Sequence, residues 1–111
     1  MVKLLPEAVK RLFTKPFTIQ YPRKKPRIPE NFRGMHIYDK ELCIFCRLCE
    51  INCPNNAIKV DRDKKTWEVD LGKCIFCQVC EEVCPTKPKA VKLSRAYELA
   101  GSQKKDFILR F

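Results

Sequence analysis

The sequence CIFCRLCEINCP, residues 43–54, returns with small changes as CIFCQVCEEVCP at residues 74–85. Eight of the twelve positions are identical, including every cysteine, the Ile-Phe pair and the closing proline. The two copies together hold all eight cysteines of the chain. The chain therefore contains an internal duplication, and we call the two copies the first and the second cysteine motif.

Each motif spaces its cysteines as Cys-x2-Cys-x2-Cys-x3-Cys-Pro, the run by which bacterial ferredoxins bind cubane iron–sulfur clusters. Three thiolates on one tight loop can reach three iron atoms of a cube, so the fourth ligand must come from elsewhere. In two-cluster ferredoxins the fourth cysteine of each run binds the other cluster. We therefore predict two [4Fe–4S] clusters, the first bound by Cys43, Cys46, Cys49 and Cys84 and the second by Cys74, Cys77, Cys80 and Cys53.

Two other uses of eight cysteines fit this spacing less well. A disulfide framework is typical of secreted proteins, but no signal peptide precedes the motifs, and x2 spacing crowds the thiols too closely for bridges. Structural zinc sites use paired Cys-x2-Cys units, not three successive cysteines followed by a three-residue gap and proline. The iron–sulfur interpretation is therefore preferred over both.

Length and charge limit what the chain can be. The 111 residues allow one small domain with extensions, and cubanes would cross-link a domain too small to bury a large core. The formal net charge is +10, so the protein is basic. No apolar run approaches the length needed to span a bilayer, which predicts a soluble or peripheral protein.

Residues 1–33 are predicted to be a helix followed by an extended arm. In residues 1–15 Pro6 suits a first helical turn, and one face of the helix is apolar, formed by Leu5, Ala8, Val9, Leu12 and Phe13. This face could pack on the protein's own core, on a partner or on a membrane surface; we favour a partner that itself sits at the membrane.

The arm, residues 16–33, is rich in proline and in basic side chains. Four prolines forbid a helix and favour an extended chain. We expect the arm to be disordered or laid along another protein, where its prolines reduce the entropy lost on binding. Nucleic-acid binding is disfavoured because the aromatic residues are not interleaved with the charges as on a single-strand platform.

Residues 34–93 are predicted to be an α+β domain with pseudo-twofold symmetry. Strands at 36–38 and 67–69 stand at matching distances before the two motifs, and strands at 57–60 and 90–93 follow them. Residues 57–61 and 66–70 should form a hairpin. Ile44, Phe45, Ile58, Ile75, Phe76 and Val91 are expected to cover the clusters and keep water from the sulfurs.

The C-terminal region, residues 94–111, is predicted to contain a helix and a tail. Ser94 could cap a helix over 94–100 that Gly101 would end. The tail, 107–111, is apolar, and it could equally fold back on the domain or insert into a partner. His36, the single histidine, is expected to make a structural hydrogen bond.

Segments outside the motifs resemble the eight-iron ferredoxin subunit of respiratory complex I and of the related membrane-bound [NiFe] hydrogenases. These are KPFTIQYP at 15–22, FRGMH at 32–36, and YELA at 97–100 with Lys105-Asp106. Two features depart from the family. The linker between Cys53 and Cys74 is shorter than in the complex I versions, which favours the hydrogenase-type branch, and Arg47 and Gln78 stand where ferredoxin runs often have glycine.

The resemblance implies an electron relay inside a membrane-bound complex, at the cytoplasmic face of the membrane. Its partners would be hydrogenase-like large and small subunits and a membrane-arm subunit, with only peripheral membrane contact. The alternatives are a complex I-type subunit, a free soluble ferredoxin and, in another class, a basic nucleic-acid-binding module. The sequence shows no nucleophile, general base or phosphate-binding loop, so no catalytic residue is predicted.

Overall fold

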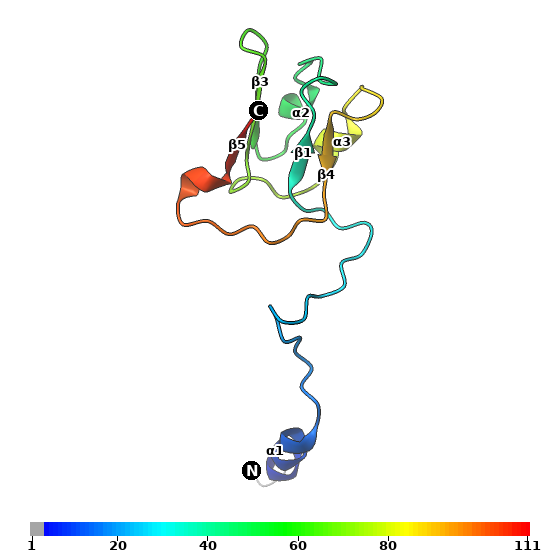
Figure 1. Ribbon diagram of the computed structural model, residues 1–111, viewed down its shortest axis with the longest axis vertical. Coiled ribbons are helices and arrows are strands. Elements are labelled where there is room, and N and C mark those ends of the chain that lie inside the picture. Colours follow the sequence, from blue (N-terminus) through cyan, green and yellow to red (C-terminus); the bar gives the residue numbers. More distant parts are fainter. Residues whose placement is uncertain (1–3) are drawn as a thin grey trace.

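The computed structural model describes residues 4–111, an elongated molecule with extents of 70 × 30 × 27 Å. The duplicated region forms a compact body at one end (Figure 1). From this body the arm leads to helix α1 (Leu4–Phe13), which stands apart at the opposite end (Figure 1). The N-terminal helix and the domain are therefore separate in space.

The predicted N-terminal helix is confirmed over Leu4–Phe13, and residues 1–3 of the prediction lie outside the described residues. Pro6 lies in the first turn, and Glu7 pairs with Arg11 at 3.2 Å one turn later. None of the ten residues of α1 is buried by any part of the chain that the structure describes. Leu12 and Phe13 are 80% and 88% exposed. The apolar face thus finds no core within the described protein.

Two small antiparallel sheets build the domain. β1 (His36–Tyr38) pairs with β4 (Val91–Leu93), and β2 (Ile58–Asp61) pairs with β3 (Thr66–Asp70). Short helices α2 (Leu48–Ile51) and α3 (Val79–Glu82) lie between the strands of each half. The first half therefore runs β1, α2, β2 and the second β3, α3, β4, and each sheet takes one strand from each half. The predicted fold class and the 57–70 hairpin are confirmed.

The core lies where the two sheets and the two helices meet. Strand alternation directs Ile58 and Val60 of β2 inward and Lys59 outward, and on β3 it buries Trp67 and Val69 completely. Val91 of β4 and Cys80 of α3 belong to the same apolar cluster. A cysteine of the second motif is thus part of the core itself.

The C-terminal tail folds back on the domain. β5 (Ile108–Arg110) adds to the free edge of β3, with Leu109 opposite Val69 (Figure 1). Beyond the strand, Phe111 and Trp67 exchange backbone hydrogen bonds of 2.9 and 3.2 Å. The Phe111 ring lies 5.3 Å from that of Tyr38 and 5.9 Å from that of Trp67. The sequence left two possibilities open for the tail, and the structure has it folded back on the domain.

The predicted helix over residues 94–100 is wrong. Ser94 does not cap a helix; its hydroxyl donates to the carbonyl of Met35 at 2.7 Å and accepts the N–H of Ala96. The backbone here pairs with the residues that precede β1, because Gly34 donates to the Ser94 carbonyl at 2.8 Å and Met35 to that of Ala96 at 3.0 Å. Ser94 thus bonds Met35, some 60 residues away in sequence, in place of the local helix cap that the sequence predicted.

Helical structure in this region comes later, as the short 3-10 helix η1 (Lys104–Phe107). Gln103 and Asp106 form a reciprocal capping box at its start. Gly101 therefore precedes a helix instead of ending one. η1 leads directly into β5 and so positions this strand at the edge of β3.

Part of the arm lies along this C-terminal segment, not free in solvent. The hydroxyl of Tyr21 donates to Glu98 at 2.5 Å, and the ammonium of Lys25 binds the other oxygen of the same carboxylate at 3.0 Å. The rings of Phe32 and Tyr97 meet edge to face, 6.2 Å apart. Residues 21–33 therefore contact the protein's own C-terminal segment, which the sequence did not predict.

Gly34→Ala should destabilise the domain, because an added Cβ would lie 2.2 Å from the carbonyl oxygen of Ala96 and 2.8 Å from that of Ser94. Both neighbours are backbone atoms, so the strands must separate, and we expect a loss of about 1–3 kcal/mol. Thermal unfolding of the cluster-loaded chain measures this loss. Gly72→Ala is the matched control, since its Cβ would approach only the Asp70 side chain. Equal melting temperatures for the two variants would contradict the prediction.

Candidate metal centre

The two cysteine motifs adopt the same backbone path. Phe45 and Arg47 in the first motif have φ of 51° and 66°, and Phe76 and Gln78 in the second have 52° and 73°. These left-handed conformations curl each loop so that successive cysteines face the same side. They also account for the glycine that ferredoxin runs often carry at the Arg47 and Gln78 positions, since glycine adopts positive φ at little cost.

In this chain the two side chains at those positions bind acidic residues of the helices that follow. Arg47 precedes α2 and pairs with Glu50 at 2.8 Å, and Gln78 precedes α3 and donates to Glu81 at 3.4 Å. Both carboxylates lie in the first turn of a helix, where negative charge is favourable. The non-glycine residues thus bring a side-chain contact with the first turn of the following helix along with the backbone strain.

Backbone N–H groups point at the cysteine sulfurs in both loops. The N–H of Phe45 donates to Cys43 Sγ and that of Phe76 to Cys74 Sγ, each at 3.4 Å. The N–H of Ala57 donates to Cys53 Sγ at 3.3 Å. Such donors stabilise thiolates, the form that binds iron. The geometry of the loops therefore fits a thiolate-bound metal cluster.

Four of the cysteines line one small cavity: Cys43, Cys46, Cys49 and Cys84. The remaining walls are largely apolar and include Phe45, Val60 and Val91. Cys84 comes from the second motif, so the structure brings it to the three leading cysteines of the first motif. The donor set and the apolar surroundings fit an iron–sulfur cluster shielded from water.

The other four cysteines also neighbour one another. Burial raises the pKa of the Cys74 thiol, and the nearby thiols of Cys53 and Cys77 add to the effect. Burial likewise raises the pKa of Cys80 to about 12, and the thiols of Cys74, Cys49 and Cys77 add to the effect. Cys53 of the first motif is thus found beside Cys74 of the second. A bound metal would favour the thiolate form despite this burial.

Two arginines hold the backbone of the cysteine loops. Arg62, in the turn of the β2–β3 hairpin, donates to the carbonyls of Phe45 and Cys46, each at 3.1 Å. Arg33, at the end of the arm, donates to the carbonyl of Cys77 at 3.4 Å. Each loop therefore has a guanidinium beside it, and neither contact was predicted from the sequence.

Three side chains on β1 and β3 have buried polar atoms, and one of them contacts a cysteine. His36 is 2% exposed, and its Nε2 lies 3.9 Å from Cys74 Sγ. The Tyr38 hydroxyl and the Trp67 indole N–H are also buried and have no hydrogen-bond partner within residues 4–111. The expected structural role of His36 is thus a contact with a cysteine of the second motif. The burial of the Tyr38 and Trp67 polar atoms was not predicted from the sequence.

The predicted cover of the clusters is only partly correct. Phe45, Phe76, Ile58 and Val91 belong to or pack against the core cluster. Ile44 and Ile75 are 65% and 56% exposed, although Ile44 also lines the cavity of Cys43, Cys46, Cys49 and Cys84. The curl of each loop leaves the second residue of the motif partly open to solvent. These two isoleucines place apolar surface on the outside of the domain, next to the cysteines.

Residues 42–87 match the family described as "4Fe-4S dicluster domain". This match includes all eight cysteines, so the chain binds two [4Fe–4S] clusters. No helix within residues 4–111 is long and apolar enough to cross a membrane.

Similarity to known proteins extends well beyond the motifs. The chain is 41% identical over 110 residues to NADH-quinone oxidoreductase subunit I 1 of Geobacter sulfurreducens, covering 90% of this chain and 83% of that protein. It is 34% identical over 112 residues to subunit I 2 of Geobacter metallireducens, covering 90% and 84%.

A solved structure also matches the whole fold. It is a chain of the membrane-bound sulfane sulfur reductase, described as an archaeal respiratory membrane complex, with a TM-score of 0.70 and 30% identity. The match covers 96% of the present chain and 58% of that chain. Since identity and coverage with the Geobacter proteins include the arm and the C-terminal segment, the chain belongs to the NADH-quinone oxidoreductase subunit I family.

Proposed function

We propose that this protein relays single electrons through its two [4Fe–4S] clusters as a subunit of a membrane-bound respiratory oxidoreductase complex. The observation that carries the proposal is the placement of the two motifs. They fold as two similar loops on one small domain, related by pseudo-twofold symmetry. Each motif brings its fourth cysteine near the other motif. When bound, cubane clusters take up and release one electron at a time. The chain's own residues supply ligands, donors and exclusion of water.

The proposed ligand sets are crossed. Cys43, Cys46, Cys49 and Cys84 would bind the first cluster, and Cys74, Cys77, Cys80 and Cys53 the second. The shared cavity of the first set supports this assignment, as does the proximity of Cys53 to Cys74. A short helix contains the third cysteine of each motif and leads to the fourth, which would carry the fourth thiol away from its own loop.

The proposed role of residues 1–33 is docking. The apolar face of α1 is exposed, and the arm carries exposed charges such as Arg23 and Lys24. An exposed apolar stripe on a helix is the feature by which helices dock into a partner's groove. We propose that α1 docks on a membrane-arm subunit, which would keep the protein peripheral, at the cytoplasmic face of the membrane.

The branch of the family to which this chain belongs, hydrogenase-type or complex I-type, stays a prediction. The short linker between Cys53 and Cys74, which contains the β2–β3 hairpin, favours the hydrogenase type, with hydrogenase-like large and small subunits as partners. The relatives described above are NADH-quinone oxidoreductase subunits and a sulfane sulfur reductase. A free soluble ferredoxin would have no use for an exposed docking helix. Purification of the tagged full chain with its native complex, followed by identification of the catalytic subunit, tests the proposal and its branch together.

Cys53→Ser should alter the same cluster as Cys77→Ser, although the two residues lie in different motifs. A hydroxyl is a harder and weaker ligand to iron than a thiolate, so the affected cluster should change its potential or lose an iron atom. Electron paramagnetic resonance of the reduced variants shows which signal changes. Cys84→Ser should correspondingly match Cys46→Ser. If Cys53→Ser instead matches Cys46→Ser, each motif closes its own cluster and the crossed assignment is wrong.

Leu5→Glu combined with Leu12→Glu should weaken assembly into the complex without changing the spectrum of the clusters. Both side chains are exposed on the apolar face of α1, far from the domain (Figure 1). Burial of one leucine contributes about 1.5–3 kcal/mol, so the pair should reduce affinity for the docking partner by more than about tenfold. Co-purification yield with a membrane-arm subunit measures this loss.

Lys10→Glu, on the same helix but off the apolar face, is the matched control for added negative charge. It should assemble nearly as well as the unmodified chain, because an exposed charge contributes little. Equal yields for all three proteins would assign α1 to a role other than docking.

A further inference from the structure

The arm bends between α1 and the domain, and the bend shapes a hollow. The N–H of Lys24 donates to the carbonyl of Gln20 at 2.8 Å, so a turn separates two limbs of the arm. Residues 15–20 on one limb and residues 24–27 on the other line a single hollow with a volume of about 650 Å³. This volume is typical of a site that binds a small molecule. The arm therefore offers a preformed binding site outside the domain.

The hollow is lined by basic side chains and by no acidic one. Its four cations are Lys15, Lys24, Lys25 and Arg27, and Thr18 and Gln20 add a hydroxyl and an amide. Lys25 is already bound to Glu98 at 3.0 Å, but the other three cations make no ion pair within residues 4–111. Positive charges gathered around one hollow attract an anion. Phosphate suits these donors, because its oxygens accept hydrogen bonds from lysine and arginine.

Exposed apolar side chains lie next to this basic hollow. Phe17 is 89% exposed and Ile19 is 55% exposed, and both belong to the limb that leaves α1. The Arg11 guanidinium lies 5.4 Å from the centre of the Phe17 ring, which places this ring against the helix. Ile19 also lines the hollow itself. The exposed apolar surface of α1 thus continues along the arm to the hollow.

The charge of residues 4–27 is strongly one-sided. The stretch contains one acidic residue, Glu7, and seven basic residues: Lys10, Arg11, Lys15, Arg23, Lys24, Lys25 and Arg27. Exposed apolar side chains beside clustered lysine and arginine are the pattern by which peripheral proteins bind anionic membrane surfaces. An acidic protein surface would satisfy the charges, but it would leave Phe17 and Ile19 without apolar contacts. A phospholipid supplies a phosphate and acyl chains together.

We propose that the hollow of the arm binds the phosphate headgroup of an anionic phospholipid, with Lys15, Lys24 and Arg27 around the phosphate. The exposed apolar side chains of the same limb would then face the acyl chains. The inference rests on the proposed function, which places α1 on a membrane-arm subunit and so brings the arm close to the lipid headgroups. Because the arm is bonded to Glu98 of the C-terminal segment, a lipid in the hollow would also fix the position of the domain relative to the membrane.

The test is flotation of the cluster-loaded full chain with phosphatidylcholine vesicles that contain or lack phosphatidylglycerol. The chain should bind the vesicles with the anionic lipid far more strongly. Lys15→Gln combined with Lys24→Gln and Arg27→Gln should weaken this binding by about fivefold for each charge removed, or about a hundredfold in all. All three side chains are exposed, so the absorption spectrum of the clusters should not change.

The matched control removes three positive charges from the domain, by Lys59→Gln, Lys64→Gln and Lys104→Gln. These lysines are also exposed, and none of them lines the hollow. Vesicle binding should stay within about twofold of that of the unmodified chain, because charges far from the membrane surface are screened by salt. Equal losses for the two triple variants would overturn the proposal. So would weak or equal binding of the unmodified chain to both kinds of vesicle.

Free phosphate is the other source of the same chemistry. If inorganic phosphate displaces the chain from the vesicles better than chloride of equal ionic strength, the hollow binds the free ion and the lipid assignment is overturned. Failure of the lipid site is distinguishable from failure of docking, because co-purification with the membrane-arm subunit tests α1 separately. A chain that joins the complex but does not prefer anionic vesicles would leave the proposed function standing and remove only the lipid site.

Discussion

Three thiols on one short loop can meet only three corners of a cubane, and this shortage ties the two halves of the domain together. Each motif of this chain presents three cysteines on a curled loop and sends the fourth toward the other half. Strand pairing repeats the arrangement, because β1 pairs with β4 and β2 with β3 across the halves. Neither half could therefore form its sheet alone, and under the crossed assignment proposed above neither could complete its ligand set. A small core suffices because metal ligation would supplement it.

Duplication makes the two sites alike, and the departures from symmetry make them different. The loops share positive φ values, sulfur-directed N–H groups and a basic residue beside the backbone. The differences lie in side chains that flank the motifs, at positions 38 and 69 and at positions 55 and 86. The two halves have therefore diverged at the flanks of the motifs, while the loops have kept the same backbone path.

The sequence predicted the elements that depend on local spacing. It did not predict structure that depends on contacts between distant segments. The β1 strand and the β2–β3 hairpin were found because alternation and motif spacing are local signals. The helix over 94–100 was wrong because Ser94 bonds Met35, a partner that no local pattern reveals. The contact of His36 with Cys74 could not be predicted for the same reason, since the two residues lie in different halves of the duplication.

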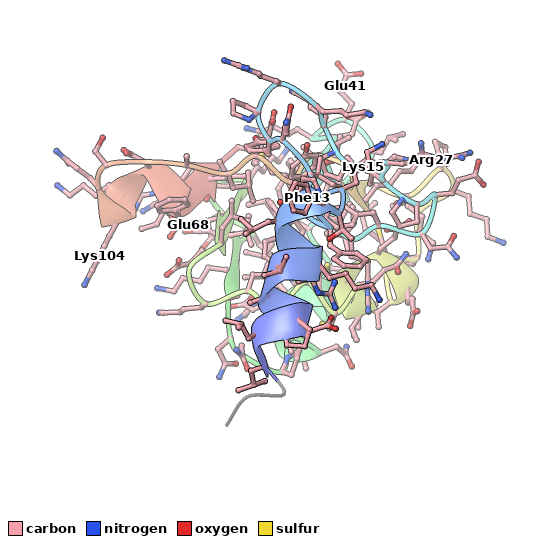
Figure 2. The ribbon with its side chains drawn as sticks, turned by 90° about the horizontal axis from the view of Figure 1, so that it is seen from below. Phe13, Lys15, Arg27, Glu41, Glu68 and Lys104 are labelled. Atoms are coloured by element: carbon pink, nitrogen blue, oxygen red, sulfur yellow. The ribbon has the colours of Figure 1, made fainter. Side chains whose placement is uncertain are left out.

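The arm has no helix or strand of its own, yet it can fix the direction in which the chain leaves the domain. Tyr21 and Lys25 both bind Glu98, and beyond them no described contact ties α1 to the domain. Figure 2, viewed from the α1 end of the molecule, shows the helix in front of the domain with Phe13 at its junction with the arm. Exposed ion pairs contribute little stability each. Here, however, two donors share one carboxylate on a proline-rich chain that has little freedom to lose. The two bonds to Glu98 can therefore hold α1 away from the cysteine loops. A partner bound at the helix would then not need to cover the surface through which electrons pass.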